Sequence, residues 1–412
     1  MTRCARARTV RLALSVVALT LAAAGAQAQP GTVLDVEPRG TFSAAAVRDQ
    51  TAGRFRNNGA EPLPVRSAVR SYVMRFETRD ADGAPATALA HLFVPEEPSD
   101  AGTLLAFAPG STGLVDACAP SRPYVQGGGL ETYGAYGLAY AGQGMPTVVP
   151  NYVGFFDPSA RQPYFVADAE AHVVLDALRA ASTALTAMAG ELAPTHAFAA
   201  GFSQGGHAVF AAADRAAEDA PDVPLAGVIG FGPSGEVEVV MRAFPYVAPW
   251  ILVAYAEVYG SSIDPVALLQ QPFAGRLAND VERLCIAEVQ ASYPGDPTAL
   301  LEPSLARSLL DGTLATTHPE LAELVDLNRT GVREHALPVI ILQGVDDPVA
   351  PLADQDRFVE RLCELGSAVR YATYLRTRHE TRYIGFEEAL TWMRAIVAGE
   401  SAPSDCDLVP RE

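Results

Sequence analysis

A serine flanked by glycines, directly after a short apolar run, is the feature that most constrains how this chain can fold. The segment is Gly201-Phe202-Ser203-Gln204-Gly205. The run 196–200 before it predicts a short buried strand, and the alanine-rich run 206–218 after it predicts a helix. A serine at a sharp turn from strand to helix takes a strained backbone conformation, which neighbouring glycines make possible. Its hydroxyl would then project above a sheet, near a helix N-terminus that favours developing negative charge.

Two further segments supply partners for such a serine. In folds that use this turn, the serine is followed along the chain by an acid and then by a histidine. The β-branched run 337–343 predicts a buried parallel strand, and the turn after it holds Asp346 and Asp347. We favour Asp347, because it stands three residues after a glycine and directly before a Pro-Val-Ala-Pro turn. A last strand is predicted over 368–375, and His379 follows it.

These residue types meet the needs of nucleophilic catalysis. A serine is a poor nucleophile at its ordinary pKa, so a neutral imidazole must take its proton during attack. An acid must hold that imidazole in the right tautomer and stabilise its charged form. The order along the chain therefore predicts Ser203 as the nucleophile, His379 as the base and Asp347 as the orienting acid.

Such a reaction also needs two backbone N–H donors for the tetrahedral oxyanion. One is expected from Gln204, the residue after the nucleophile. The other is expected from the loop 108–113, which follows a predicted strand over 103–107 and contains two glycines. Ser111 is the first candidate in this loop, and Gly110 is close behind it. Neither a metal ion nor an organic cofactor is expected.

Beyond the serine turn, several runs of the chain resemble the secretory lipase (LIP) family of α/β-hydrolases. These are Pro109–Gly113, Cys118–Ser121, Asn151–Phe155 and Leu175–Ala181, together with the turn that holds Asp347, and Trp392 before Cys406. The resemblance implies an α/β-hydrolase fold, with a mostly parallel central sheet and helices on both faces. It also implies activity on carboxylic esters and a helical cap, which we place at 235–335. The catalytic core would then consist of residues 29–234 and 336–412.

The cysteines point to an oxidising compartment. Of the five, Cys4 lies within residues 1–28, which are predicted below to be removed as a signal peptide. The other four are an even number, as disulfides require, and they allow three pairings. The family resemblance implies Cys118 with Cys285 and Cys363 with Cys406. The alternative is four buried free thiols, and the spacing does not match a metal cluster.

Residues 1–28 have the pattern of a secretory signal peptide. Four arginines precede an apolar run over 12–24 and the small-residue sequence Ala26-Gln27-Ala28. We expect cleavage near Ala28 and export to the periplasm or the extracellular space.

The remaining chain is strongly acidic. The whole sequence has 30 basic residues, all arginine, against 48 acidic ones, for a formal net charge of −18. Removing residues 1–28 removes four arginines and no acid, which leaves −22. A surface of this sign repels phosphate backbones and anionic membranes, which argues against nucleic acid as a partner. Stable membrane insertion is also not expected, because prolines interrupt the apolar segment 244–255.

The remaining pattern predicts how the other elements are arranged. Residues 29–64 suggest an irregular arm, 71–77 and 88–94 suggest edge strands, and 163–182 suggests an amphipathic helix. Short strands are predicted over 147–149 and 225–231. From 235 to 335 the alternation of strand and helix stops, and the pattern favours helices joined by Pro/Gly turns.

Taken together, the sequence predicts a secreted serine carboxylic-ester hydrolase that works through an acyl-enzyme. A lipase or a broad carboxylesterase is favoured, with lipid or polyester substrates left open. A serine peptidase on the same fold and a non-catalytic binding protein are the alternatives. The aromatic segment 244–255 would either line an acyl pocket or pack the cap on the core. Asn328-Arg329-Thr330 matches a glycosylation sequon.

Overall fold

The computed structural model describes most of the chain that follows the predicted signal peptide. It covers residues 29–98, 102–122, 130, 132–157, 160–189, 194–260 and 263–408. The predicted signal peptide and its cleavage position near Ala28 lie outside the described residues.

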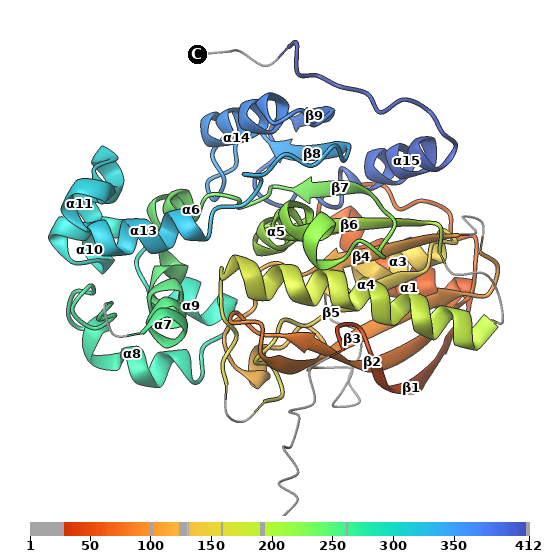
Figure 1. Ribbon diagram of the computed structural model, residues 1–412, viewed down its shortest axis with the longest axis horizontal. Coiled ribbons are helices and arrows are strands. Elements are labelled where there is room, and N and C mark those ends of the chain that lie inside the picture. The colour runs from red at the N-terminus through yellow and green to blue at the C-terminus, as the bar shows by residue number, and fades with distance from the viewer. Residues whose placement is uncertain are drawn as a thin grey trace, which may run out of the picture.

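The centre of the molecule is a nine-stranded sheet with the order β1-β2-β3-β5-β4-β6-β7-β8-β9 (Figure 1). The strands are β1 Val33–Phe42, β2 Val69–Arg79, β3 Pro85–Pro95, β4 Thr103–Ala108, β5 Thr147–Pro150, β6 His196–Phe202, β7 Leu225–Phe231, β8 Val339–Gly344 and β9 Val369–Tyr374. Pairing is antiparallel from β1 through β3 to β5, and parallel from β5 across to β9. The predicted mostly parallel sheet is confirmed.

Helices cover both faces of this sheet, because its central strands are apolar on both sides. In β4, Leu104 and Ala106 belong to one core cluster, and Leu105 and Phe107 belong to another. The first cluster includes apolar residues of α4 (Ala167–Ala189), α5 (Gln204–Asp219) and α14 (Leu352–Glu364). The second includes those of α1 (Ala44–Asn57), α3 (Thr132–Gly142) and α15 (Phe386–Val397).

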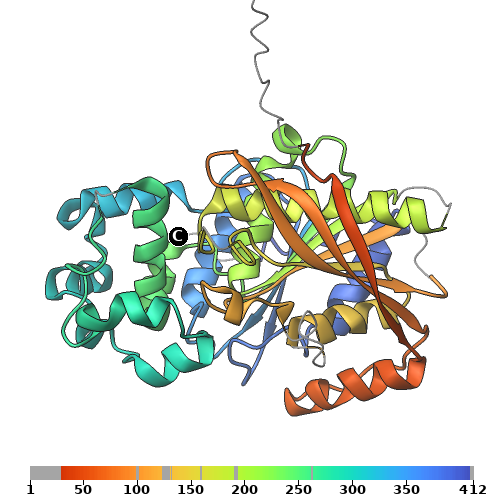
Figure 2. The same cartoon turned by 90° about the horizontal axis from the view of Figure 1, so that it is seen from below.

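The described residues between β7 and β8 form helices that gather beside one end of the sheet (Figures 1 and 2). They are α6 Val237–Ala243, η2 Pro245–Val247, α7 Ala248–Tyr259, α8 Phe273–Val281, α9 Ile286–Ser292, α10 Pro297–Leu300, α11 Pro303–Asp311, α12 Leu314–Thr317 and α13 Pro319–Leu327. We call this segment the helical insertion. Its buried residues, such as Trp250 and Leu309, belong to the same core cluster as those of α4 and α5.

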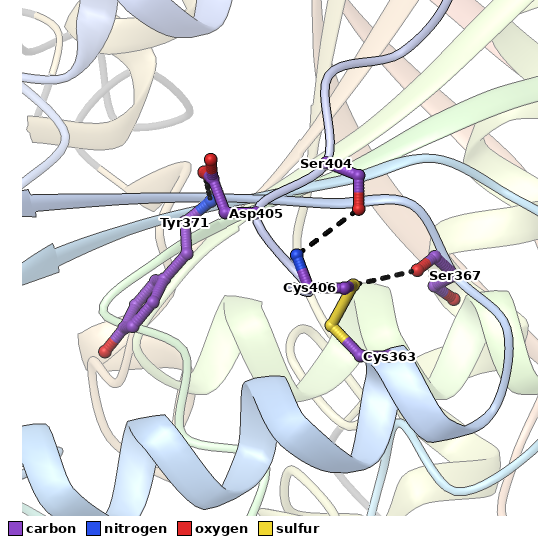
Figure 3. The surroundings of a disulfide bond; sticks show 6 residues. All are labelled: Cys363, Ser367, Tyr371, Ser404, Asp405 and Cys406. Carbon is purple, nitrogen blue, oxygen red and sulfur yellow. Dashed lines mark hydrogen bonds between the residues drawn. A yellow bond between two sulfur atoms is a disulfide. The ribbon is translucent and has the colours of Figure 1, made fainter. Parts of the chain in front are cut away.

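Two disulfides join distant parts of the chain, and they are the pairs implied by the family resemblance. Cys118 bonds to Cys285 at the start of α9, across a sequence separation of 167. Cys363 in α14 bonds to Cys406 in the C-terminal tail (Figure 3). Next to Cys406, the Asp405 carboxylate accepts a hydrogen bond from the Tyr371 backbone at 2.8 Å. The tail is therefore held along the outer edge of β9.

The expectations for the N-terminal region are wrong. Residues 29–64 include β1 and α1 rather than forming an irregular arm. Most β1 residues are exposed. The sequence therefore lacks the alternation of apolar and polar side chains by which a half-buried strand is recognised. Pairing with β2 holds β1 in the sheet. The segments 71–77 and 88–94 consequently lie in inner strands, β2 and β3, and not at an edge.

The helix predicted over 163–182 is shifted and is more buried than expected. It is α4, which begins at Ala167 and ends at Ala189. It packs against the sheet on one side and against α5 on another, so its residues 169–178 are all buried. Because the sheet and α5 cover two sides of α4, the helix lacks the single apolar face from which an amphipathic pattern predicts burial.

Among the described residues, no single helix is long and apolar enough to cross a membrane. The segments Val237–Ala243 and Pro245–Tyr259 reach that length and composition only together, with a bend of 110° between them.

Candidate active site

Ser203 occupies a sharp turn between β6 and α5. Its backbone has φ 56° and ψ −116°, a conformation that residues with a side chain rarely adopt. Neither Gly201 nor Gly205 could carry a side chain, because other backbone atoms occupy the place of a Cβ. A Cβ at Gly201 would lie 1.9 Å from the carbonyl oxygen of Gly205, and a Cβ at Gly205 would lie 2.0 Å from that of Ala108. The turn is therefore strained and pressed against the end of β4.

A buried Asp347 and a half-buried His379 form a pair at the ends of β8 and β9. The imidazole Nδ1 lies 2.8 Å from Oδ2 of Asp347. The other carboxylate oxygen accepts hydrogen bonds from the backbone N–H groups of Val349 and Ala350, at 2.8 and 3.0 Å. The neighbouring Asp346 is exposed. It is thus Asp347, the favoured candidate, that contacts the imidazole.

The His379 ring lies beside the residue that precedes the serine. Its centroid is 4.9 Å from that of the Phe202 ring. Gly232 after β7 leaves room for the pair, since a Cβ there would lie 3.1 Å from Nδ1 of His379. Nε2 of His379 is buried and has no hydrogen-bond partner in the part of the chain described, so no hydrogen bond joins it to the Ser203 hydroxyl. The free nitrogen can accept a proton, and such contacts often tighten only when substrate binds.

The loop after β4 lies directly against the serine turn. A Cβ at Gly110 would be 3.0 Å from the carbonyl oxygen of Phe202. The Tyr133 hydroxyl lies against Gly110, where a Cβ would be 2.6 Å from it, and burial raises the pKa of Tyr133 to about 12. The Ser111 hydroxyl lies 2.5 Å from that of Tyr164. These side chains hold the loop in one position.

The two backbone donors predicted first for an oxyanion are those of Gln204 and Ser111. Within the described residues, neither N–H group donates to a backbone carbonyl. Gly110, the second candidate in the loop, lies against the Tyr133 hydroxyl.

A buried polar network behind the serine turn is absent from the sequence-based predictions. The Glu170 carboxylate in α4 accepts hydrogen bonds from Nε2 of Gln204 at 2.7 Å and from the backbone of Phe165 at 3.1 Å. Its second oxygen lies 2.6 Å from Nδ1 of His207. All three side chains of Glu170, Gln204 and His207 are buried. An acid in the first turn of a helix is common, so the sequence carries no signal for this contact.

Asn328 connects this network to the helical insertion. Its carbonyl lies 2.7 Å from Nε2 of His207, and its side chain accepts hydrogen bonds from the backbone of Ala167 and the hydroxyl of Tyr259. Asn328 is only 1% exposed, so the sequon that begins there is closed to glycosylation in the folded protein.

The aromatic segment of the insertion packs onto the core near these residues. Trp250 lies edge-on to Tyr164, with 5.7 Å between ring centroids. The hydroxyl of Tyr255 donates to the carbonyl of Phe165 at 3.2 Å. Both side chains are fully buried, which favours ordinary packing over an acyl pocket for these two residues.

A groove of about 770 Å³ opens elsewhere, between the β2–β3 turn, residues 153–157 and 160–163, and α7. Its lining is acidic and includes Asp82, Glu257 and Glu282, with Arg161 paired to the two glutamates. Ser203 is not part of it. Among the described residues, no group of His, Cys, Asp or Glu is arranged to hold a metal ion.

Comparison with known proteins agrees with this arrangement. The sequence model of the secretory lipase family matches residues 137–405, which is more than half of the chain. The chain belongs to the secretory lipase family. The match includes Ser203, Asp347 and His379 and ends just before Cys406.

Individual relatives of this chain are distant. It is 28% identical over 89 residues to Lipase A of Arthroderma benhamiae, and the match spans 21% of this chain and 19% of that relative. The rice cell wall degrading esterase LipA from Xanthomonas oryzae superposes with a TM-score of 0.70 at 18% identity, covering 90% of this chain and 97% of that one. Candida antarctica lipase A in its closed state superposes with a TM-score of 0.67 at 16% identity, covering 91% and 84%. These likenesses establish the predicted α/β-hydrolase fold.

Proposed function

We propose that the protein is a secreted serine carboxylic-ester hydrolase, of the lipase or carboxylesterase type. The observation that carries this proposal is the strained Ser203 at the start of α5, near the His379–Asp347 pair, in which Nε2 of His379 has no hydrogen-bond partner among the described residues. Family membership supports the same activity. The two relatives of solved structure are named as an esterase and a lipase, which supports a carboxylic ester as the substrate.

The reaction follows from the roles of these groups. Nε2 of His379 takes the proton of the Ser203 hydroxyl while its oxygen attacks the ester carbonyl. The negative oxygen of the tetrahedral intermediate accepts hydrogen bonds from the N–H groups of Gln204 and Ser111. Asp347 stabilises the charged imidazole, which then protonates the leaving alcohol. Water attacks the acyl-enzyme by the same route, with His379 again acting as base and then as acid.

Two features support secretion. Residues 1–28 have the composition of a signal peptide, and the chain carries two disulfides, which persist in oxidising compartments. We extend the proposal to cleavage near Ala28 and to a helical insertion that acts as the cap over the catalytic core.

Hydrolysis of p-nitrophenyl esters of graded acyl length tests the proposal. The wild-type protein should turn over at least one ester, and Ser203→Ala should lower kcat by on the order of 10⁴-fold or more. Circular dichroism spectra of the two proteins should match, since Ser203 contributes little to packing. Peptide cleavage without ester turnover would favour a peptidase instead, and inactivity on both substrate classes would favour a binding protein.

A further inference from the structure

A buried guanidinium lies next to the candidate active site and has no part in the mechanism above. Arg382 stands three residues after His379, in the connection between β9 and α15. Only 3% of the residue is exposed. Its guanidinium makes two hydrogen bonds of 2.6 Å to the carboxylate of Glu380, and it makes no other ion pair among the described residues.

Aromatic rings enclose the same guanidinium. Its central carbon lies 4.4 Å from the ring centroid of Phe202, 4.7 Å from that of Tyr133, 5.2 Å from that of Tyr383 and 5.7 Å from that of Tyr136. Cations over aromatic faces are attracted by the ring quadrupole, most strongly where water is excluded. The backbone carbonyl of Arg382 also accepts a hydrogen bond from the Tyr136 hydroxyl at 2.6 Å.

Two of these rings also contact the candidate catalytic groups or the loop beside them. Phe202 precedes Ser203, and its ring lies against the imidazole of His379. The Tyr133 hydroxyl lies against Gly110, where a Cβ would be 2.6 Å from it, in the loop proposed to supply an oxyanion donor. One side chain therefore touches supports of the nucleophile, the base and the oxyanion loop.

Stability alone is a weak reason for a cation at this place. Apolar side chains of similar volume often replace a buried ion pair without loss of stability, because removing charges from water is costly. Nη1 of Arg382 is buried and has no hydrogen-bond partner in the described part of the chain, which adds to that cost. Fixing the relative positions of the surrounding groups is a benefit that an apolar side chain would not supply, because it lacks the directional contacts.

We infer that Arg382 is a positioning residue of the proposed ester hydrolase. Its guanidinium, held by Glu380, clamps the rings of Phe202 and Tyr133, and so sets the distance between His379, Ser203 and the oxyanion loop. Displacements of about 1 Å in such groups can lower the rate on the order of 100-fold. This inference rests on the proposed function.

The test compares substitutions at two arginines that each lie over aromatic rings and pair with a carboxylate, the buried Arg382 and the more exposed Arg276. Arg276 in α8 lies over Phe273 and Tyr293, at 5.1 and 5.0 Å, and pairs with Asp280 at 3.0 Å. Its contacts all lie within the helical insertion. Arg382→Met and Arg276→Met each remove a guanidinium from two or more rings and a carboxylate. Both are expected to lower the melting temperature, whereas only Arg382→Met should affect the chemical step.

The kinetic expectations are specific. Arg382→Met should lower kcat on p-nitrophenyl esters by about 10- to 100-fold, with KM within about twofold of wild type. Arg276→Met should leave kcat within about twofold. Arg382→Lys keeps the charge but loses the two-point contact with Glu380, so its kcat should lie between those of Arg382→Met and wild type.

Other results would overturn the inference. If kcat is unchanged by Arg382→Met while Ser203→Ala abolishes turnover, the positioning role is wrong and the proposed function stands. If both substitutions at Arg382 prevent folding, or if Arg276→Met lowers kcat equally, the residue is structural. If the wild-type protein shows no Ser203-dependent ester turnover, the proposed function itself has failed.

Discussion

The carboxylate of Glu170 contacts two side chains in the first turn of α5, the helix that follows Ser203. Gln204 and His207 both belong to α5, one turn apart, and both point at this carboxylate. Nε2 of His207 faces a carbonyl, which can only accept, so that nitrogen carries a proton. This network fixes the first turn of α5, and with it the N–H of Gln204.

Replacing Glu170 with Ala should therefore weaken both stability and rate. The truncation leaves the buried N–H groups of Gln204 and Phe165 without their acceptor, which costs on the order of 3 kcal/mol. Urea unfolding measures the loss, and kcat on a p-nitrophenyl ester should fall as well. Glu218→Ala is the matched control, because Glu218 is largely exposed and its pair with Arg333 contributes little. Equal stability of the two variants would contradict the role given to Glu170.

Among the elements, the loop after β4 depends most on a distant partner. The carbonyl of Thr112 accepts a hydrogen bond from the backbone of Ile286 at 2.9 Å, and Cys118 is bonded to Cys285. The start of α9 thus holds the loop that carries Ser111. The second disulfide has no such contact, because it joins α14 to the tail along β9.

Removing each disulfide separately should distinguish these roles. In the loop-entropy model, Cys118→Ser with Cys285→Ser costs about 5 kcal/mol and Cys363→Ser with Cys406→Ser costs about 4 kcal/mol. Both double variants should melt at lower temperature than wild type. Only the first should lower kcat, because only that bond holds the oxyanion loop. Equal kcat in both double variants would show that the loop keeps its position without the bond.

For the whole molecule, a histidine inside the sheet limits stability in acid. His91 in β3 is 2% exposed, and burial, followed by the charge of Arg39, lowers its pKa from 6.5 to about 3. Below pH 6.5 the unfolded chain binds a proton that the folded protein does not, so stability falls as pH falls. The loss from this one group is on the order of 1.4 kcal/mol per pH unit until pH 3.

His91→Gln removes this titration. Its free energy of unfolding, measured in urea between pH 7 and 5, should depend less steeply on pH than that of wild type. Some dependence should remain, because burial also lowers the pKa of His172 and His335. The same slope in both proteins would contradict the assignment to His91.

The sequence was most informative where structure depends on residues that are neighbours along the chain. The strand and helix around Ser203 followed from an apolar run and a pair of glycines, and they correspond to β6 and α5. The strand before Asp347 and the strand before His379 were predicted within two residues of β8 and β9. β1 was missed because its exposed residues follow no period, and its pairing with β2 alone holds it in the sheet.

By itself, the sequence determined the fold class, the order of the candidate catalytic residues and the family, because glycines, apolar periods and short motifs act locally. Only the tertiary structure decided that Glu170 meets His207 and that Arg382 lies among the rings of Phe202 and Tyr133. These contacts join residues on separate elements, and a single glutamate or one of 30 arginines has no local pattern that marks its partner. Packing of the elements against one another creates the buried surroundings in which such pairs matter.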